Sequence, residues 1–276
     1  MKHSQHEIES ADGTRIGMRV YGETGPGIVA LHGGMKSARD FDRLATELAA
    51  DFRVYVPDRR GRGMSGPHGD GYGMHKEVQD VSAILAATGA RLGFGLSSGA
   101  LVLLRTALAD AGALDRIALY EPPLQIAGGI PVDFMARYER EIDEGRNAAA
   151  LITVLRGLEA DPLFTRLPRA VLTPMIAVGL RLDKTIGELV PTERYDFQLI
   201  REMADTQAEY AGLTPRVLLL DGTKSPHFLR EPLDTLQRVL PAADRVSFDG
   251  LTHEGPEDDG GPLLVARTLR GFFTAP

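Results

Sequence analysis

One serine stands in a setting that would make it a nucleophile. Residues 95–99 read Gly-Leu-Ser-Ser-Gly and match the pattern Gly-x-Ser-x-Gly, between an expected strand at 91–96 and an expected helix at 98–110. At such a tight turn the serine is held in a strained conformation with its hydroxyl exposed, and the flanking glycines let the backbones approach. The pattern therefore predicts Ser97 as the nucleophile of an acyl-transfer reaction.

A serine nucleophile needs a base to take its proton, and His253 is the histidine best placed for this. It lies in the segment Gly-Leu-Thr-His-Glu-Gly at 250–255, after the expected last strand at 244–248. The chain order of serine first and histidine near the C-terminus fits a strand–turn–helix nucleophile. His227, which lies near a loop, is the rival. His32 is expected to be structural, packing and hydrogen-bonding within its own loop.

The acid that should orient the histidine is less obvious. Its usual place is three residues beyond a glycine that follows the strand at 216–220, and there the chain has Ser225, which cannot ionise. Asp221 is on that strand but stands directly before the glycine, so we expect it to point away. Glu121 ends the expected strand at 116–120, and the carboxyl ends of parallel strands share one crevice. Glu121 is therefore the preferred acid and Asp221 the alternative.

Two backbone N–H groups should form an oxyanion hole beside the nucleophile. The N–H of Ser98 is one of them, while the Ser98 hydroxyl should point elsewhere. The second is expected from the loop after the short apolar run at 28–31, which reads His32-Gly33-Gly34. Gly34 is the preferred donor and Gly33 the next choice.

The elements that must position these groups alternate between strand and helix. Asp12-Gly13 predicts a hairpin turn between strands at 7–10 and 15–21. Later strands and helices alternate, with helices expected among others at 74–88 and 231–240, which predicts an eight-stranded, mostly parallel sheet flanked by helices. Residues 124–212 show helical patterns alone, at 133–144, 148–159, 168–182 and 192–210. The predicted organisation is an α/β core at 1–123 and 213–276 with a helical cap or lid at 124–212.

Composition excludes several classes of function. The 276 residues carry a net charge of −7, which disfavours binding to nucleic acid, and the arginines at 59, 60 and 62 are expected to form structural salt bridges. There is no cysteine, so disulfides and thiolate chemistry are excluded. The polar start of the chain does not resemble a signal peptide, and no apolar run approaches the ~20 residues that span a bilayer. We expect a cytoplasmic protein without a membrane span.

Taken together, these segments resemble the α/β-hydrolase superfamily over nearly the whole chain, and the resemblance implies the α/β-hydrolase fold. The resemblance is carried by residues 32–34, the Asp-Arg-Arg-Gly-Arg-Gly-Met-Ser-Gly stretch at 58–66, residues 95–99 and His253. The Ser-Ser-Gly-Ala segment at 97–100 and Glu121 are similar to the elbow and acid of fungal zearalenone lactonases. Haloalkane dehalogenases and epoxide hydrolases use an aspartate nucleophile, so the serine argues against those reactions.

The resulting hypothesis is a serine hydrolase that cleaves a carboxylic ester or lactone without a metal or organic cofactor. The helical cap should bind a moderately apolar small molecule. A possible homodimer, the substrate and the pathway stay open. Two alternatives also stay open: a small-molecule receptor or slow-turnover binding protein on the same fold, and a hydrolase of C–C or thioester bonds.

Overall fold

The computed structural model describes residues 3–159 and 162–275, and its centre is one eight-stranded sheet in the order β1-β2-β4-β3-β5-β6-β7-β8. β2 pairs antiparallel with both β1 and β4, and all other pairs are parallel. The predicted fold class is therefore confirmed. The strands are β1 Ser4–Glu9, β2 Arg15–Tyr21, β3 Gly27–Leu31, β4 Arg53–Pro57, β5 Leu92–Leu96, β6 Arg116–Tyr120, β7 Arg216–Gly222 and β8 Asp244–Phe248.

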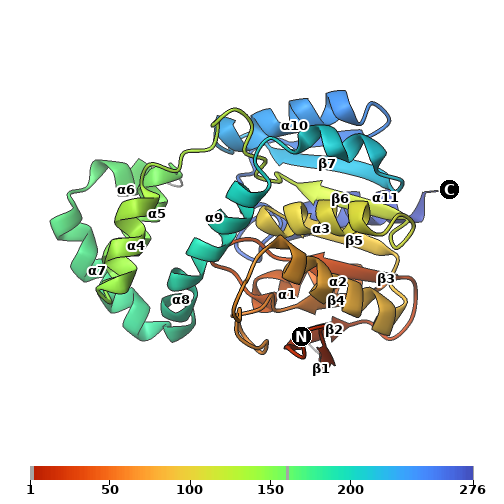
Figure 1. The fold of residues 1–276 in the computed structure, drawn as a ribbon, viewed down its shortest axis with the longest axis horizontal. Coiled ribbons are helices and arrows are strands. Elements are labelled where there is room, and N and C mark those ends of the chain that lie inside the picture. The colour runs from red at the N-terminus through yellow and green to blue at the C-terminus, as the bar shows by residue number, and fades with distance from the viewer. Residues whose placement is uncertain (1–2, 160–161, 276) are drawn as a thin grey trace.

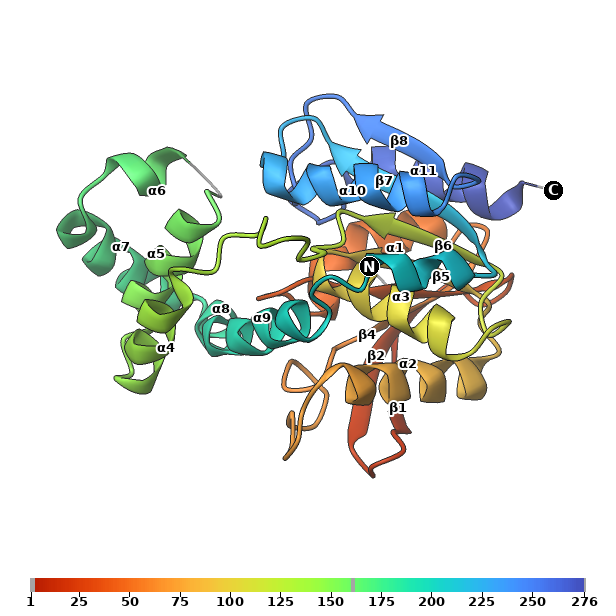
Figure 2. The same ribbon diagram turned by 45° about the horizontal axis from the view of Figure 1, so that its top comes forward.

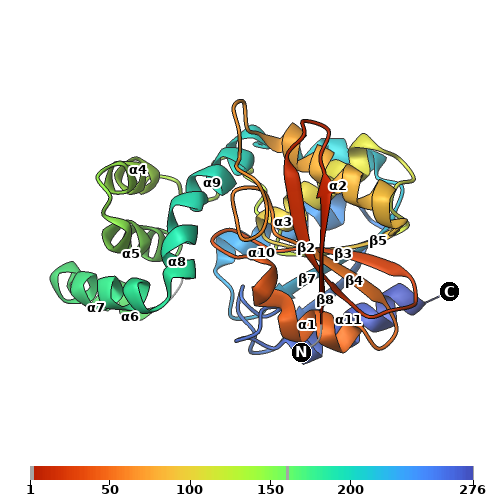
Figure 3. The same ribbon diagram turned by 90° about the horizontal axis from the view of Figure 1, so that it is seen from below.

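Helices cover both faces of the sheet (Figure 1). One face carries α1 (Asp42–Leu48), preceded by the 3₁₀ turn η1 (Ala38–Phe41), and α11 (Pro262–Thr274), while α2 (Met74–Thr88), α3 (Ser98–Ala109) and α10 (His227–Val239) cover the other, as the view from below in Figure 3 shows. Every residue of β5 is buried. Short apolar strands of this kind are typical of a parallel sheet covered on both sides.

Between β6 and β7 the described residues, 121–159 and 162–215, form helices and loops without a strand. Figure 2 shows α4 to α8 standing beside the α/β core, with α9 leading the chain back to it. The elements are α4 Met135–Asp143, α5 Asn147–Gly157, α6 Pro162–Arg166, α7 Arg169–Leu182, α8 Lys184–Leu189, η2 Val190–Thr192, α9 Glu193–Glu202 and η3 Gln207–Gly212.

Several predicted helix boundaries in this region are wrong. The single helix expected at 192–210 is instead η2, α9 and η3, with a break at Asp205, which takes a φ of 57° and donates its N–H to the Gln125 carbonyl at 2.9 Å. The short helices α6 and α8 were not predicted. α8 is separated from α7 by Asp183, whose carboxylate caps it by accepting the N–H of Thr185.

The helix expected at 231–240 begins earlier, at His227, so that Pro232 lies inside α10. Proline favours the first helical turn, whereas Pro232 is the sixth residue of this helix. The apolar stripe of Leu229, Leu233 and Leu236 is buried and holds the longer helix on the sheet. Across the two described stretches of chain, no helix combines the length and apolarity that a bilayer crossing requires.

Candidate active site

Ser97 forms the turn between β5 and α3 and has φ 54° and ψ −127°, a region that residues with a side chain rarely adopt. Its N–H donates to the Tyr120 carbonyl at 2.9 Å. The turn closes only because its flanks lack side chains: a Cβ on Gly99 would lie 2.4 Å from the Leu31 carbonyl oxygen, and one on Gly95 would lie 2.5 Å from Ala100 Cα. This geometry presents the Ser97 hydroxyl at the start of α3.

Glu121 and His253 meet at the same end of the sheet. Glu121 directly follows β6, is fully buried and has a φ of 45°, so the chain is strained there as well. Its Oε1 accepts the N–H of Gly222 at 2.8 Å, and its Oε2 lies 2.5 Å from His253 Nδ1. A carboxylate can only accept, so Nδ1 carries the hydrogen and Nε2 is the free basic nitrogen.

The loop that bears His253 is held from the neighbouring strand. Tyr120, the last residue of β6, donates its hydroxyl to the Thr252 carbonyl at 2.7 Å. The His253 side chain is 27% exposed, so the imidazole contacts a buried carboxylate while part of the ring stays accessible. An imidazole held in one tautomer by a carboxylate is suited to general-base catalysis.

The rival residues lie elsewhere. Asp221 is buried, and its carboxylate accepts hydrogen bonds from Arg230 at 3.0 Å and from Ser247 at 2.7 Å. Ser225 is buried, and its hydroxyl has no hydrogen-bond partner within residues 3–159 and 162–275. His227 lies on the surface with its side chain 85% exposed, 3.6 Å from Glu231. Neither the alternative acid nor the rival histidine takes part in the contact between Glu121 and His253.

The loop after β3 brings two glycines to the site. A Cβ built on Gly33 would lie 3.0 Å from Ser97 Cβ, so Gly33 is beside Ser97. Gly34 lies against two carboxyl groups of the helical segment: its Cβ position is 2.5 Å from Glu193 Oε2 and 3.3 Å from Asp196 Cγ. These carboxyl groups were not singled out in the sequence.

His32 supports this loop from behind. It is fully buried, its Nδ1 bonds the Gly33 carbonyl at 2.9 Å, and its Nε2 accepts the N–H of Arg59 at 3.1 Å. Burial, with the nearby charges of Arg62 and Arg59, lowers the pKa of His32 well below its usual value. A neutral imidazole with both nitrogens bonded is structural, as the sequence predicts.

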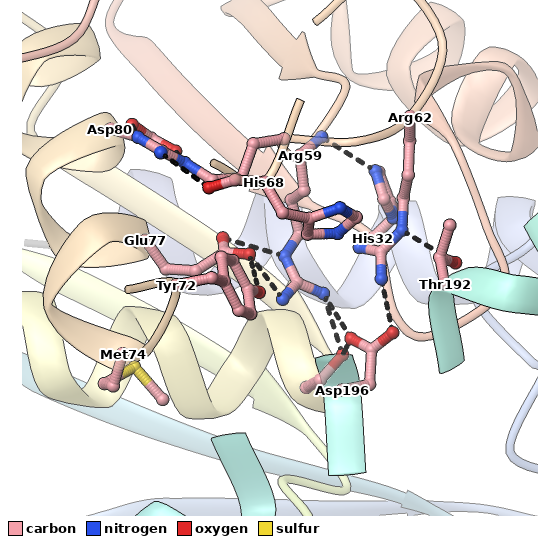
Figure 4. Close-up of polar contacts among 12 residues, drawn as sticks. His32, Arg59, Arg62, His68, Tyr72, Met74, Glu77, Asp80, Thr192 and Asp196 are labelled. Atoms are coloured by element: carbon pink, nitrogen blue, oxygen red, sulfur yellow. Dashed lines mark hydrogen bonds and ion pairs between the residues drawn. The ribbon is translucent and has the colours of Figure 1, made fainter. Parts of the chain in front are cut away.

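A buried ion network around Arg59, Arg62 and Asp196 joins the helical segment to the α/β core (Figure 4). The Arg59 guanidinium lies between two carboxylates, 2.9 Å from Glu77 Oε1 and 2.9 Å from Asp196 Oδ1. Ser98 Oγ accepts from Arg59 at 2.8 Å and donates to Asp196 at 2.7 Å, and Arg62 also bonds Asp196. Burial opposes the ionisation of Asp196, but the charges of Arg62 and Arg59 outweigh it and lower its pKa to about 2.

This network gives the arginine stretch its role. Arg59 and Arg62 pair with Asp196, and Arg60 pairs with Asp80 at 2.5 Å and with Asp12 at 2.9 Å. The expectation of structural salt bridges is thus confirmed. Three buried arginines signal buried carboxylates, because unpaired charges are rarely buried. The arginine pattern does not identify those carboxylates, since Asp196 belongs to α9, far along the chain.

Comparisons with known proteins agree with this architecture. The 3-hydroxybutyrate-oligomer hydrolase of Cupriavidus necator is 27% identical over 274 residues, covering 90% of this chain and 88% of that protein. An alpha/beta hydrolase from Sphaerobacter thermophilus has a TM-score of 0.80 and 28% identity, covering 98% of this chain and all of that one. The enol-lactonase of Burkholderia xenovorans shares the fold with a TM-score of 0.71 and 21% identity, over 98% of this chain and 100% of its own.

The family model described as the alpha/beta hydrolase family matches residues 28–267, from β3 into α11. This range includes the serine turn, the glutamate after β6, the helical segment and the histidine loop. The chain belongs to the alpha/beta hydrolase family.

Proposed function

We propose that this protein hydrolyses a carboxylic ester or lactone through an acyl-enzyme on Ser97, with His253 as base and Glu121 as acid. The observation that carries the proposal is the 2.5 Å contact between Glu121 Oε2 and His253 Nδ1, at the sheet end where Ser97 is held in a strained turn. Strained backbone and a buried acid–base pair are features of functional sites. The substrate class fits this chemistry because serine is a nucleophile toward activated carbonyl carbon.

In the first half of the reaction, Ser97 Oγ attacks the carbonyl carbon while His253 Nε2 takes the hydroxyl proton. Glu121 holds the imidazole in the right tautomer and stabilises the imidazolium that forms. The tetrahedral intermediate then collapses, the C–O bond to the alcohol breaks, and His253 returns the proton to the departing oxygen. With a lactone, the released hydroxyl stays attached to the acyl chain.

In the second half, His253 takes a proton from water as its oxygen attacks the acyl carbon. The bond to Ser97 Oγ breaks, the serine recovers its proton, and the carboxylic acid leaves. The N–H groups of Ser98 and Gly34, with Gly33 as the second choice, stabilise the negative charge in both halves.

The relative from Cupriavidus necator supports an ester substrate. A 3-hydroxybutyrate unit has one hydroxyl and one carboxyl group, so its oligomers are joined by ester bonds, and that relative covers 90% of this chain. We propose further that residues 124–212 act as a cap over the core formed by 1–123 and 213–276 and bind a moderately apolar substrate. Binding sites for small molecules are mostly apolar with a few polar groups.

Turnover of p-nitrophenyl acetate and p-nitrophenyl butyrate tests the proposal. Ser97→Ala should lower kcat by at least about 10³-fold, because removing any one member of a catalytic triad abolishes most of its rate enhancement. His253→Asn should do the same, whereas His227→Asn is the matched control, an exposed histidine that should leave kcat unchanged. A serine-directed fluorophosphonate should label Ser97, as read by mass spectrometry of the modified peptide.

Two results would contradict the proposal. Full activity of Ser97→Ala would remove the nucleophile. Tight binding of ester ligands with negligible turnover by the wild type would point to a receptor instead of an enzyme.

A further inference from the structure

Glu193 is a buried carboxyl group that has no partner among the residues that the structure describes. It begins α9 and is 6% exposed, and its Oε2 is a buried atom without a hydrogen bond. Within 3–159 and 162–275, no hydrogen bond or ion pair involves its side chain. Burying a polar group without a partner is costly, so native proteins rarely do so without a functional reason.

The carboxyl group is directed at the proposed oxyanion loop. Glu193 Oε2 lies 2.5 Å from the position that a Cβ on Gly34 would occupy, so it leaves no room for any side chain there. Gly33, the preceding residue, is beside Ser97. The unpartnered oxygen is thus next to the loop whose N–H should meet the substrate carbonyl.

Burial and the neighbouring Asp196 carboxylate favour the neutral form of this group, against the opposing positive charges of Arg62, Arg59 and Lys36. Arg59 and Arg62, two of these positive charges, already pair with Asp196 on the same helix. Burial, together with the Asp196 carboxylate, raises the pKa of Glu193 to about 8. The titratable and charged groups that face Glu193 are Asp196 of α9, Arg59 and Arg62 of the loop after β4, Lys36 of the loop after β3, and Tyr138 of α4.

We propose that Glu193 is a further catalytic residue, whose carboxyl O–H donates a hydrogen bond to the substrate carbonyl oxygen as negative charge develops on it. The inference rests on the proposed function and adds a third donor to the N–H groups of Gly34 and Ser98. A carboxylic acid kept neutral by an apolar site can serve an enzyme as a donor to an oxyanion. The ionised form would repel the same oxygen, so ionisation should switch the contribution off.

The expected effect of removing the group is on kcat more than on KM. Glu193→Ala should lower kcat toward p-nitrophenyl butyrate by about 10²-fold at pH 7, in line with the loss of one oxyanion donor. Glu193→Gln keeps an N–H donor in place and should retain most of the activity. Glu188→Gln is the control, because Glu188 is an exposed glutamate of the preceding helix.

The pH profile separates a donor from a group that only supports the fold. Wild-type kcat should fall as the pH rises above about 8, as Glu193 loses its proton. Glu193→Gln has no proton to lose and should keep its rate from pH 7 to 10. If Glu193 only supports the fold, kcat should change with pH above about 8 in the same way in the wild type and in Glu193→Gln.

Two outcomes would overturn the inference: a Glu193→Ala variant with wild-type kcat, or a Glu193→Gln variant with the same alkaline loss as the wild type. If Glu193→Ala does not fold, as judged by circular dichroism, the profile of Glu193→Gln decides alone. Failure of the proposed function is a different result, because Ser97→Ala would then be active. An inactive Ser97→Ala beside a fully active Glu193→Ala refutes the role of Glu193 only.

Discussion

Glu121 and His253 are separated by 132 positions in the chain, yet Oε2 of the glutamate lies 2.5 Å from Nδ1 of the histidine. The carboxylate reaches the imidazole from the end of β6, and β7 lies between β6 and β8 in the sheet. The Gly222 N–H at the end of β7 binds the other carboxylate oxygen at 2.8 Å and fixes its orientation. Glu121 is therefore held by β7, the neighbouring strand, and directed at the loop that follows β8.

Replacing this carboxylate by an amide should impair catalysis without a comparable loss of fold. Glu121→Gln is expected to lower kcat by about 10³–10⁴-fold, the scale seen when the acid of a serine protease triad becomes an amide and the histidine adopts the wrong tautomer. Steady-state hydrolysis of p-nitrophenyl esters measures this. Asp221→Asn is the matched control on the next strand and should keep kcat, because Asp221 bonds Arg230 and Ser247 instead. A loss confined to Asp221→Asn would reverse the assignment of the acid.

The serine turn should tolerate no side chain at Gly99. Gly99→Ala would place a methyl group 2.4 Å from the Leu31 carbonyl oxygen, so backbone must move. We expect a loss in the free energy of unfolding of at least about 1–3 kcal/mol, measured by urea denaturation. Gly271→Ala provides the contrast, since this glycine lies in α11 with nothing within 4 Å of an added Cβ. It should stabilise the protein by about 0.5–1 kcal/mol. Equal effects at both positions would contradict the close approach at the turn.

Removing the Asp196 carboxylate from the buried network should lower stability strongly. Asp196→Asn leaves Arg59 and Arg62 without the carboxylate that they share, and removing one member of a buried ion pair costs about 3–5 kcal/mol. The free energy of unfolding, from urea melts, is the measurement. Asp143→Asn removes an ion pair with Arg194 whose carboxylate is 69% exposed, and should change stability by less than about 1 kcal/mol. Similar losses in the two variants would mean that the network stabilises the fold no more than a surface pair does.

The unusual pKa of Glu193 should also appear in the pH dependence of stability. The group is protonated in the folded state up to about pH 8, whereas in the unfolded chain it ionises near 4.5. Between these values the folded state binds more protons, so stability falls as the pH rises through this window. The glutamine in Glu193→Gln does not titrate, so it contributes no such loss of stability with rising pH. The stability of this variant relative to the wild type should therefore increase from pH 5 to pH 8.5, as measured by denaturation at both values. A difference independent of pH would show that Glu193 titrates normally.

The parts of the fold with strong local signals were predictable. The strand β6 and the helix α2 have the predicted bounds, because short β-rich apolar runs and a 3.6-residue apolar stripe mark such elements clearly. The helical segment was harder. The break at Asp205 depends on a hydrogen bond to Gln125, which is far away in the chain. The N-cap at Asp183 depends on a local turn of the backbone. The helices α6 and α8 are too short to show a periodic pattern.

The sequence by itself determined the fold and named the groups that meet at the end of the sheet, because Gly-x-Ser-x-Gly at a strand–helix boundary and the histidine loop are local patterns. The tertiary structure alone decided the contacts between distant segments. It placed Glu121 against His253 and directed Asp221 toward two arginines. It also set Glu193 and Asp196 of the helical segment beside the glycine loop. No periodicity encodes such contacts, since they depend on how α9 returns to the core. On α9, burial and neighbouring charges shift the pKa values of Glu193 and Asp196, one turn apart, in opposite directions.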